Sequence, residues 1–136
     1  MLKRPELLSP AGNLTKLKIA LEYGAEAVYG SVASFSLRTR SAREFNLETF
    51  KEAIDYTHEK GKKFYATINA FPFNSQIEPL KRHLQTISAM KPDAFIIATP
   101  GVKSLAKEIA PDIEIHLSTQ ANVMNVLDAK IYHDMG

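Results

Sequence analysis

Short apolar runs alternate along the chain with longer segments whose apolar residues recur at spacings of three and four. A continuous apolar run is typical of a buried parallel strand, and the three-and-four spacing is typical of a helix with one buried face. The runs predict strands at 6–9, 27–30, 63–69, 94–98 and 113–118. A helix is expected after each strand, so one strand–helix unit is repeated five times.

Residues that favour helix ends support these boundaries. Asn13 and Asn46 stand where the first and second helices should begin, and asparagine is a good N-cap. Gly24 and Gly61 stand where the same helices should end. The last helix is expected to begin near Asn122.

Parallel strands with intervening helices form either a closed barrel or an open doubly wound sheet. A complete barrel needs about 250 residues, and this chain has 136. The expected fold class is α/β, with the chain forming the first five βα units of a TIM-like parallel barrel. A five-stranded doubly wound sheet is the alternative. No linker or shift in composition divides the sequence, so residues 1–136 are expected to form a single domain, the N-terminal portion of a barrel.

Charge and cysteine content narrow the chemistry. Lys+Arg 17 against Asp+Glu 15 gives a net charge of +2, which is too small to argue for a nucleic-acid partner. The chain has no cysteine, so it holds no disulfide, thiolate nucleophile or cysteine-bound metal or cluster, and no cofactor is expected in it. No window approaches the roughly 18 apolar residues that cross a bilayer. A cytoplasmic location without membrane contact is expected.

The sequence shows no familiar catalytic signature. Its four histidines have no spacing that brings two of them together on one helix, so metal binding is not expected. His116 alone falls within a predicted strand, where it is either an inward catalytic ring or a hydrogen-bonded core histidine. The nucleophile elbow, the Walker loop and the dinucleotide glycine pattern are all missing.

In both candidate folds ligands bind beyond the carboxyl ends of the strands. The connection 31–45 is much longer than the usual two to six residues, which favours a function. It contains Ser36, Arg38, Arg40 and Arg43, a set suited to holding phosphate or carboxylate. A solvated surface loop is the other interpretation.

Neutral amides follow two of the other strands. Asn69, Gln120 and Asn122 carry donors and acceptors that can fix a substrate, although turn formation or helix capping explains each of them equally well. No catalytic residue is assigned. The predicted substrate-binding residues are Ser36, Arg38, Arg40, Asn69, Gln120 and Asn122.

The whole chain resembles peptidase family U32, the collagenase-like proteins. The motifs that carry the resemblance are Pro5-Glu6-Leu7-Leu8-Ser9-Pro10-Ala11-Gly12, Gly24-Ala25-Glu26-Ala27-Val28-Tyr29-Gly30, Phe35-Ser36-Leu37-Arg38, Ala66-Thr67-Ile68-Asn69, Pro92-Asp93-Ala94-Phe95-Ile96 and His116-Leu117-Ser118-Thr119-Gln120-Ala121-Asn122. Ser31 departs from the pattern, because family members often have a second glycine there.

This resemblance implies a TIM-like barrel and a peptidase classification without assigned catalytic residues. It also implies relatives that hydroxylate RNA, including prephenate-dependent hydroxylation of wobble uridine in tRNA, with an iron–sulfur cluster held by cysteines. Those cysteines are expected beyond the point that corresponds to Gly136. The chain alone is therefore expected to be inactive, as an N-terminal barrel fragment of an enzyme.

Three functions stay open at this point. The full-length parent acts in tRNA hydroxylation, or it is a genuine protease or collagenase, or the chain is a non-enzymatic, flavodoxin-like anion-binding module. The expected partner is RNA or an anionic small molecule. A half barrel exposes open sheet edges, so either a homodimer or a missing C-terminal half is expected to cover them.

Overall fold

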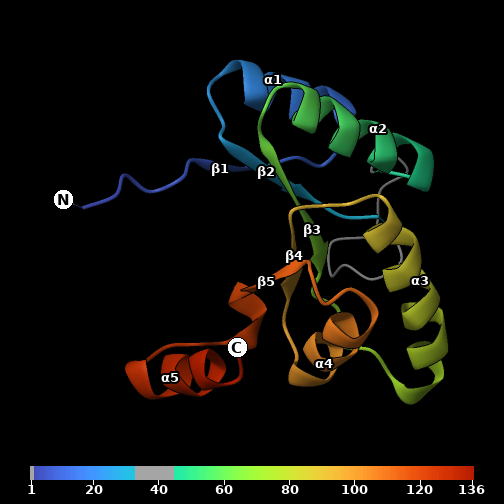
Figure 1. The fold of residues 1–136 in the computed structure, drawn as a ribbon, viewed down its shortest axis with the longest axis vertical. Coiled ribbons are helices and arrows are strands. Elements are labelled where there is room, and N and C mark those ends of the chain that lie inside the picture. The colour runs from blue at the N-terminus through green and yellow to red at the C-terminus, as the bar shows by residue number, and fades with distance from the viewer. Residues whose placement is uncertain (1, 33–44) are drawn as a thin grey trace.

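The structure, a computed structural model, describes residues 2–32 and 45–136. Strands and helices alternate along it (Figure 1). Their bounds are β1 (Leu8–Pro10), α1 (Leu14–Glu22), β2 (Ala27–Gly30), α2 (Leu47–Glu59), β3 (Lys63–Ile68), α3 (Ile77–Ala89), β4 (Ala94–Ile97), α4 (Pro100–Ile109), β5 (Glu114–Leu117) and α5 (Val126–Asp134). Two 3-10 segments, η1 (Asn74–Gln76) and η2 (Thr119–Ala121), precede α3 and follow β5. The predicted alternation of strands and helices is confirmed.

The five strands form one sheet in the order β1-β2-β3-β4-β5, and each strand is parallel to its neighbours. A doubly wound sheet reverses its strand order at a switch point, and the described strands show no reversal. The alternative of a doubly wound, flavodoxin-like sheet is therefore wrong. Sequential parallel strands are those of a partial α/β barrel, as predicted.

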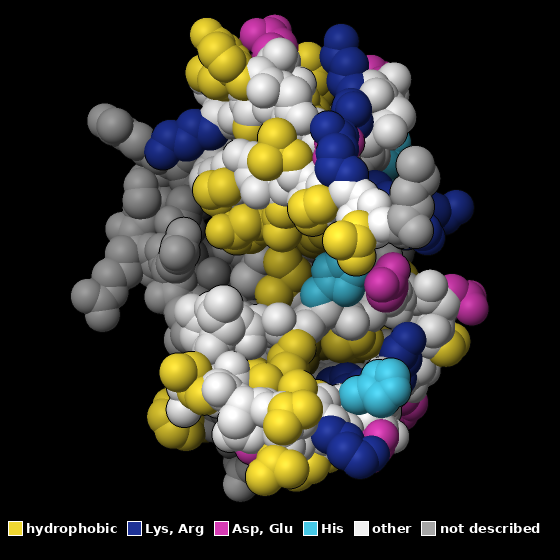
Figure 2. All heavy atoms as spheres, turned by 90° about the vertical axis from the view of Figure 1, so that its left-hand side faces the viewer, with side chains coloured by type: hydrophobic (Ala, Val, Ile, Leu, Met, Phe, Trp, Pro, Cys, Tyr) yellow, Lys and Arg dark blue, Asp and Glu magenta, His cyan; other side chains and the backbone are white. Residues whose placement is uncertain are grey.

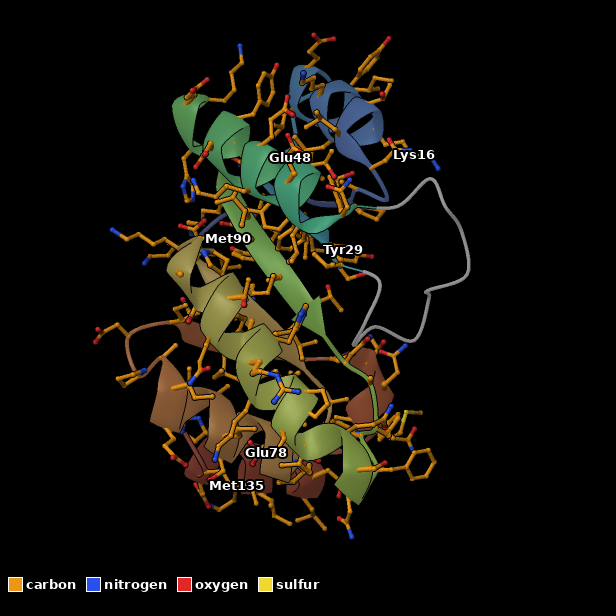
Figure 3. All side chains as sticks on the ribbon, turned by 90° about the vertical axis from the view of Figure 1, so that its right-hand side faces the viewer. Lys16, Tyr29, Glu48, Glu78, Met90 and Met135 are labelled. Carbon is orange, nitrogen blue, oxygen red and sulfur yellow. The ribbon has the colours of Figure 1, made fainter. Side chains whose placement is uncertain are left out.

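The two faces of the sheet differ in how they are covered. On the outer face Phe64, Phe95 and Ile97 are completely buried. Helices α1 to α4 contribute to the same core cluster, and Figure 3 shows α2 and α3 lying over this face. Successive strand residues point to opposite faces, so the inner face carries Tyr65 and Ala94 in a second, smaller cluster. No helix of the described residues packs on this inner face.

Three aromatic rings hold the end of the long connection to the core. Phe45, Phe50 and Phe64 are buried and meet edge to face, with centroid distances of 5.1 to 6.4 Å. This T-shaped geometry is the one that aromatic pairs favour. Phe45 is therefore fixed to the core, where it pairs with Val32 just after β2.

The first two helices begin and end as the sequence predicts. Asn13 accepts a hydrogen bond from the backbone N–H of Lys16, and Asn46 accepts one from that of Thr49, which completes a capping box. Gly24 has φ of 99° and Gly61 has φ of 67°, the left-handed region in which glycine is favoured. These local signals fix the ends of both helices.

The last helix begins later than predicted. Asn122 has φ of 60° and ends η2, so a helix cannot run through it. Asn125 is the actual N-cap of α5, because its side chain accepts hydrogen bonds from the backbone N–H groups of Leu127 and Asp128. The apolar residues Leu127 and Ile131 stay exposed.

The first strand also begins later than predicted, at Leu8 instead of Glu6. The backbone N–H of Leu7 donates to the Glu26 carboxylate at 2.8 Å. It therefore bonds to a side chain and not to the backbone carbonyl of a neighbouring strand. This hydrogen bond lowers the pKa of Glu26, with smaller help from Arg4.

In the described part of the chain no helix is long and apolar enough to span a membrane.

Candidate functional site

A pocket of about 340 Å³ opens on the inner face of the sheet, toward the carboxyl ends of the strands. This is the edge at which parallel α/β folds bind ligands. Figure 2 looks onto this side of the molecule, where hydrophobic side chains gather around a hollow near its centre. The described residues that line the pocket are Leu8, Pro10, Ala11, Gly12, Tyr29, Gly30, Ser31, Thr67, Asn69, Ile96, His116, Leu117, Ser118, Thr119 and Gln120.

One wall of the pocket is polar. Asn69 follows β3, and its Nδ2 donates to Gln120 Oε1 at 3.2 Å and to Ser118 Oγ at 3.5 Å. Ser118 also donates to Gln120 Oε1, and Thr119 Oγ1 donates to the same oxygen at 3.2 Å. Asn69 and Ser118 are buried, whereas Gln120 is exposed at the pocket. Residues from two strand ends therefore meet at the Gln120 amide.

The remaining wall is largely apolar. Leu8 and Pro10 line it from β1, Tyr29 from β2 and Ile96 from β4. Thr67 Oγ1 is buried there and has no hydrogen-bond partner among the described residues. A pocket with apolar walls and few polar groups is typical of small-ligand sites, in which the polar groups set orientation.

An ionic network lies on the same face at the amino ends of the strands. The Tyr65 hydroxyl donates to Glu6, and Lys63 Nζ pairs with the other Glu6 oxygen at 2.9 Å. These two hydrogen bonds, that from Tyr65 first, hold the pKa of Glu6 below its ordinary value. Burial, followed by the bond to Glu6, raises the pKa of Tyr65 well above its ordinary value. Tyr65 therefore stays neutral at physiological pH and fastens the N-terminal segment to the sheet.

His116 links this network to the pocket. Its ring meets that of Tyr65 edge to face at 4.6 Å, and its Nε2 lies 3.2 Å from a Glu114 oxygen. The side chain is 32% exposed and lines the pocket. His116 is therefore not a buried core histidine, which was one of its two sequence interpretations, and it faces the inner side of the sheet.

The structure brings together some of the predicted substrate-binding residues and not others. Asn69 and Gln120 meet at the pocket, as described above. Asn122 is exposed and does not line the pocket, because it takes the left-handed turn that ends η2. Ser36, Arg38 and Arg40 lie outside the described residues. Their role in binding anions stays a prediction.

Sequence reasoning missed Tyr29 and Thr67, which line the pocket from within strands. The predicted binding residues all lie at strand ends or in the loops that follow them. Strand alternation was the signal that would have found both residues, because positions two apart share a face. Thr67 stands two residues before Asn69 and therefore lies on the same face.

The described residues do not form a metal or cluster site. No group of three or more His, Asp or Glu side chains in the described ranges converges on one point, and the sequence has no cysteine. An iron–sulfur cluster needs thiolate ligands. The residues of this chain therefore do not fit such a cluster.

The chain is similar to proteins named for tRNA hydroxylation and to a collagenase. The model of "Peptidase family U32" matches residues 12–136. The tRNA hydroxylation protein P of Helicobacter pylori is 66% identical over 96% of this chain, which covers 31% of that protein. The corresponding protein of Haemophilus influenzae is 46% identical over 98% of the chain and 29% of its own length. A collagenase of Porphyromonas gingivalis is 28% identical over 93% of the chain and 30% of its own length.

Solved structures share the fold. The U32 peptidase Mk0906 aligns with all of this chain and 58% of its own, with a TM-score of 0.77 at 16% identity. Hydroxymethylglutaryl-CoA lyase from Pseudomonas aeruginosa aligns with 99% of the chain and 52% of its own, with a TM-score of 0.65 at 18% identity. The chain thus spans about a third of the curated relatives and about half of these solved chains.

Proposed function

The chain belongs to peptidase family U32, and from this membership we propose that it supplies one wall of the substrate pocket in a protein that acts in tRNA hydroxylation. The observation that carries the proposal is the 66% identity to the tRNA hydroxylation protein P of Helicobacter pylori over 96% of this chain. The pocket at the carboxyl ends of the strands supports it, since that edge carries the active sites of parallel barrels.

The residues of the chain bind and orient under this proposal, and the reactive group lies elsewhere. Asn69 and Gln120 offer amide donors and acceptors, while Tyr29 and Ile96 exclude water from one side. The iron–sulfur cluster that the family resemblance implies would take its thiolates from other parts of a longer protein. The proposed partner is RNA, and the proposed location is the cytoplasm, where tRNA is found.

Mass spectrometry of tRNA nucleosides tests the proposed function. We expect a strain that lacks the gene encoding this chain to lose a hydroxylated nucleoside from its bulk tRNA. A plasmid copy of the intact gene should restore it. If the nucleoside profile is unchanged in the deletion strain, the proposal is wrong.

Peptide-bond hydrolysis is the second candidate function, and the collagenase of Porphyromonas gingivalis favours it. Among the described residues, Ser118 and His116 do not form the serine–histidine pair that peptide-bond hydrolysis could use. His116 is paired with Glu114, and Ser118 donates to Gln120 instead of to a histidine. Incubating the purified full-length protein with gelatin tests this candidate, and release of gelatin fragments by the wild type would favour it over RNA hydroxylation.

A further inference from the structure

Two phenylalanine rings are open to solvent in the connection between β3 and α3. Phe71 is 53% exposed and Phe73 is 77% exposed. Every other phenylalanine among the described residues is at most 2% exposed. Single exposed apolar residues are common on protein surfaces, whereas two aromatic rings so close together in one connection indicate a contact surface.

The backbone that carries these rings is held in place. Pro72 has a fixed φ and restricts Phe71, the residue before it, to extended backbone. Gln76 then closes a turn on Phe73. Its side-chain oxygen accepts from the Phe73 N–H at 2.8 Å, and its own N–H donates to the Phe73 carbonyl at 2.8 Å. Ordered backbone reduces the entropy that is lost when a ligand binds to the rings.

The rings lie close to the pocket at the carboxyl ends of the strands. Asn69 lines this pocket, and Phe71 follows it by two residues in the chain. Two residues span at most about 7 Å. The connection crosses the carboxyl edge of the sheet on its way from β3 to α3. RNA that reaches the pocket therefore passes close to this connection.

The charges near the rings suit a phosphate backbone. Residues 69–77 include no Asp or Glu, so no carboxylate of this segment repels a phosphate. Arg82, in the second turn of α3, is exposed and takes part in none of the ion pairs between described residues. Guanidinium groups pair readily with phosphate. Proteins that bind single-stranded RNA combine such cations with aromatic rings on which the bases stack.

We propose that Phe71 and Phe73 form a stacking surface for unpaired bases of RNA beside the pocket. This inference rests on the proposed function in tRNA hydroxylation. Every base has a flat face, so stacking holds the strand without reading its sequence. The two rings bind RNA under this proposal and take no part in the reaction.

Binding of RNA to the full-length protein tests the inference without requiring catalysis. Fluorescence anisotropy would follow a labelled single-stranded RNA of mixed sequence and, separately, a fully paired RNA duplex of the same length. Phe73→Leu keeps an apolar side chain but removes the ring. We expect it to weaken binding of the single strand about tenfold, which is the contribution of one stacked base. Binding of the duplex should not change, because its bases already stack on one another.

Three further variants separate stacking from other effects of substitution. Phe73→Tyr keeps an aromatic ring and should bind the single strand like the wild type, whereas Phe71→Leu removes the second ring and should weaken binding. Tyr23→Leu is the matched control, because Tyr23 is 87% exposed at the end of α1, which precedes the amino end of β2. It should leave RNA binding unchanged. Thermal unfolding of all four variants should give the midpoint of the wild type, since exposed side chains contribute little to stability.

Wild-type binding of the single strand by both Phe71→Leu and Phe73→Leu would overturn the inference. An equal loss of binding in Tyr23→Leu would also overturn it. A lowered unfolding midpoint in both phenylalanine variants would do the same, because another part of the full-length protein would then cover the rings.

These outcomes are distinguishable from failure of the proposed function, which the nucleoside profile of the deletion strain tests. A strain that loses the hydroxylated nucleoside, with both leucine variants binding RNA normally, would leave the function standing and remove the stacking surface. An unchanged nucleoside profile, with weakened binding in both variants, would leave the stacking surface standing without that function.

Discussion

A single methyl group at residue 30 should disturb the junction between the first two strand–helix units. In Gly30→Ala the new Cβ would lie 2.8 Å from the carbonyl oxygen of Ala11 and 2.9 Å from Cε2 of Phe45. Both distances are shorter than real Cβ contacts, so a neighbour has to move. Neither neighbour moves easily, because the N–H of Ala11 donates to Tyr29 at 2.8 Å and Phe45 is buried in the aromatic cluster.

The expected cost follows from overpacking. An extra methyl group in a close-packed region costs about 1–3 kcal/mol in the free energy of unfolding, and contact with backbone puts Gly30→Ala toward the upper end. Gly101→Ala is the matched control. Gly101 lies in the first turn of α4, where an added Cβ meets no atom within 4 Å. Alanine also has a better helix propensity, by up to about 1 kcal/mol.

Urea unfolding followed by circular dichroism measures both variants on one scale. We expect the midpoint of Gly30→Ala to fall and that of Gly101→Ala to stay level or rise. Because Gly30 also lines the pocket, its variant should weaken ligand binding as well. A loss below about 0.5 kcal/mol in Gly30→Ala, the range of ordinary surface substitutions, would refute the steric reasoning.

Three further predictions concern stability. The pKa of Glu6 is lower in the folded state than its ordinary value, near 4.3. Glu6 therefore stabilises the folded state above that ordinary pKa, and this stability is lost as the pH falls through the lower pKa of the folded state. Tyr65→Phe should flatten this acid dependence in urea titrations at a series of pH values. Phe50→Ala should cost about 3–5 kcal/mol, whereas Phe73→Ala, at a residue 77% exposed, should change the unfolding midpoint very little; equal effects would contradict the assigned core. Asn46→Ala should lower the free energy of unfolding by about 1 kcal/mol, because it removes the capping box of α2. Asn46→Asp should retain most of the wild-type stability, and thermal unfolding measures both variants.

The polar wall of the pocket could be predicted only in part. Asn69 and Gln120 were found because the carboxyl ends of parallel strands are the expected binding edge. Their direct contact, 51 positions apart in sequence, depends on β3 and β5 flanking β4 in the sheet. Tyr29 and Thr67 were not predicted, because the face of the sheet on which a strand residue lies follows only from the alternation of the residues around it.

The sequence by itself determined the elements of this protein, because the signals for them are local. Apolar periodicity marks each strand and helix, and Asn13, Asn46, Gly24 and Gly61 mark helix ends through their own backbone and side-chain chemistry. The tertiary structure alone decided the strand order, and with it the choice of barrel over doubly wound sheet. It also decided which face of the sheet the helices leave open. Both depend on contacts between residues far apart in the chain, which a local pattern does not contain.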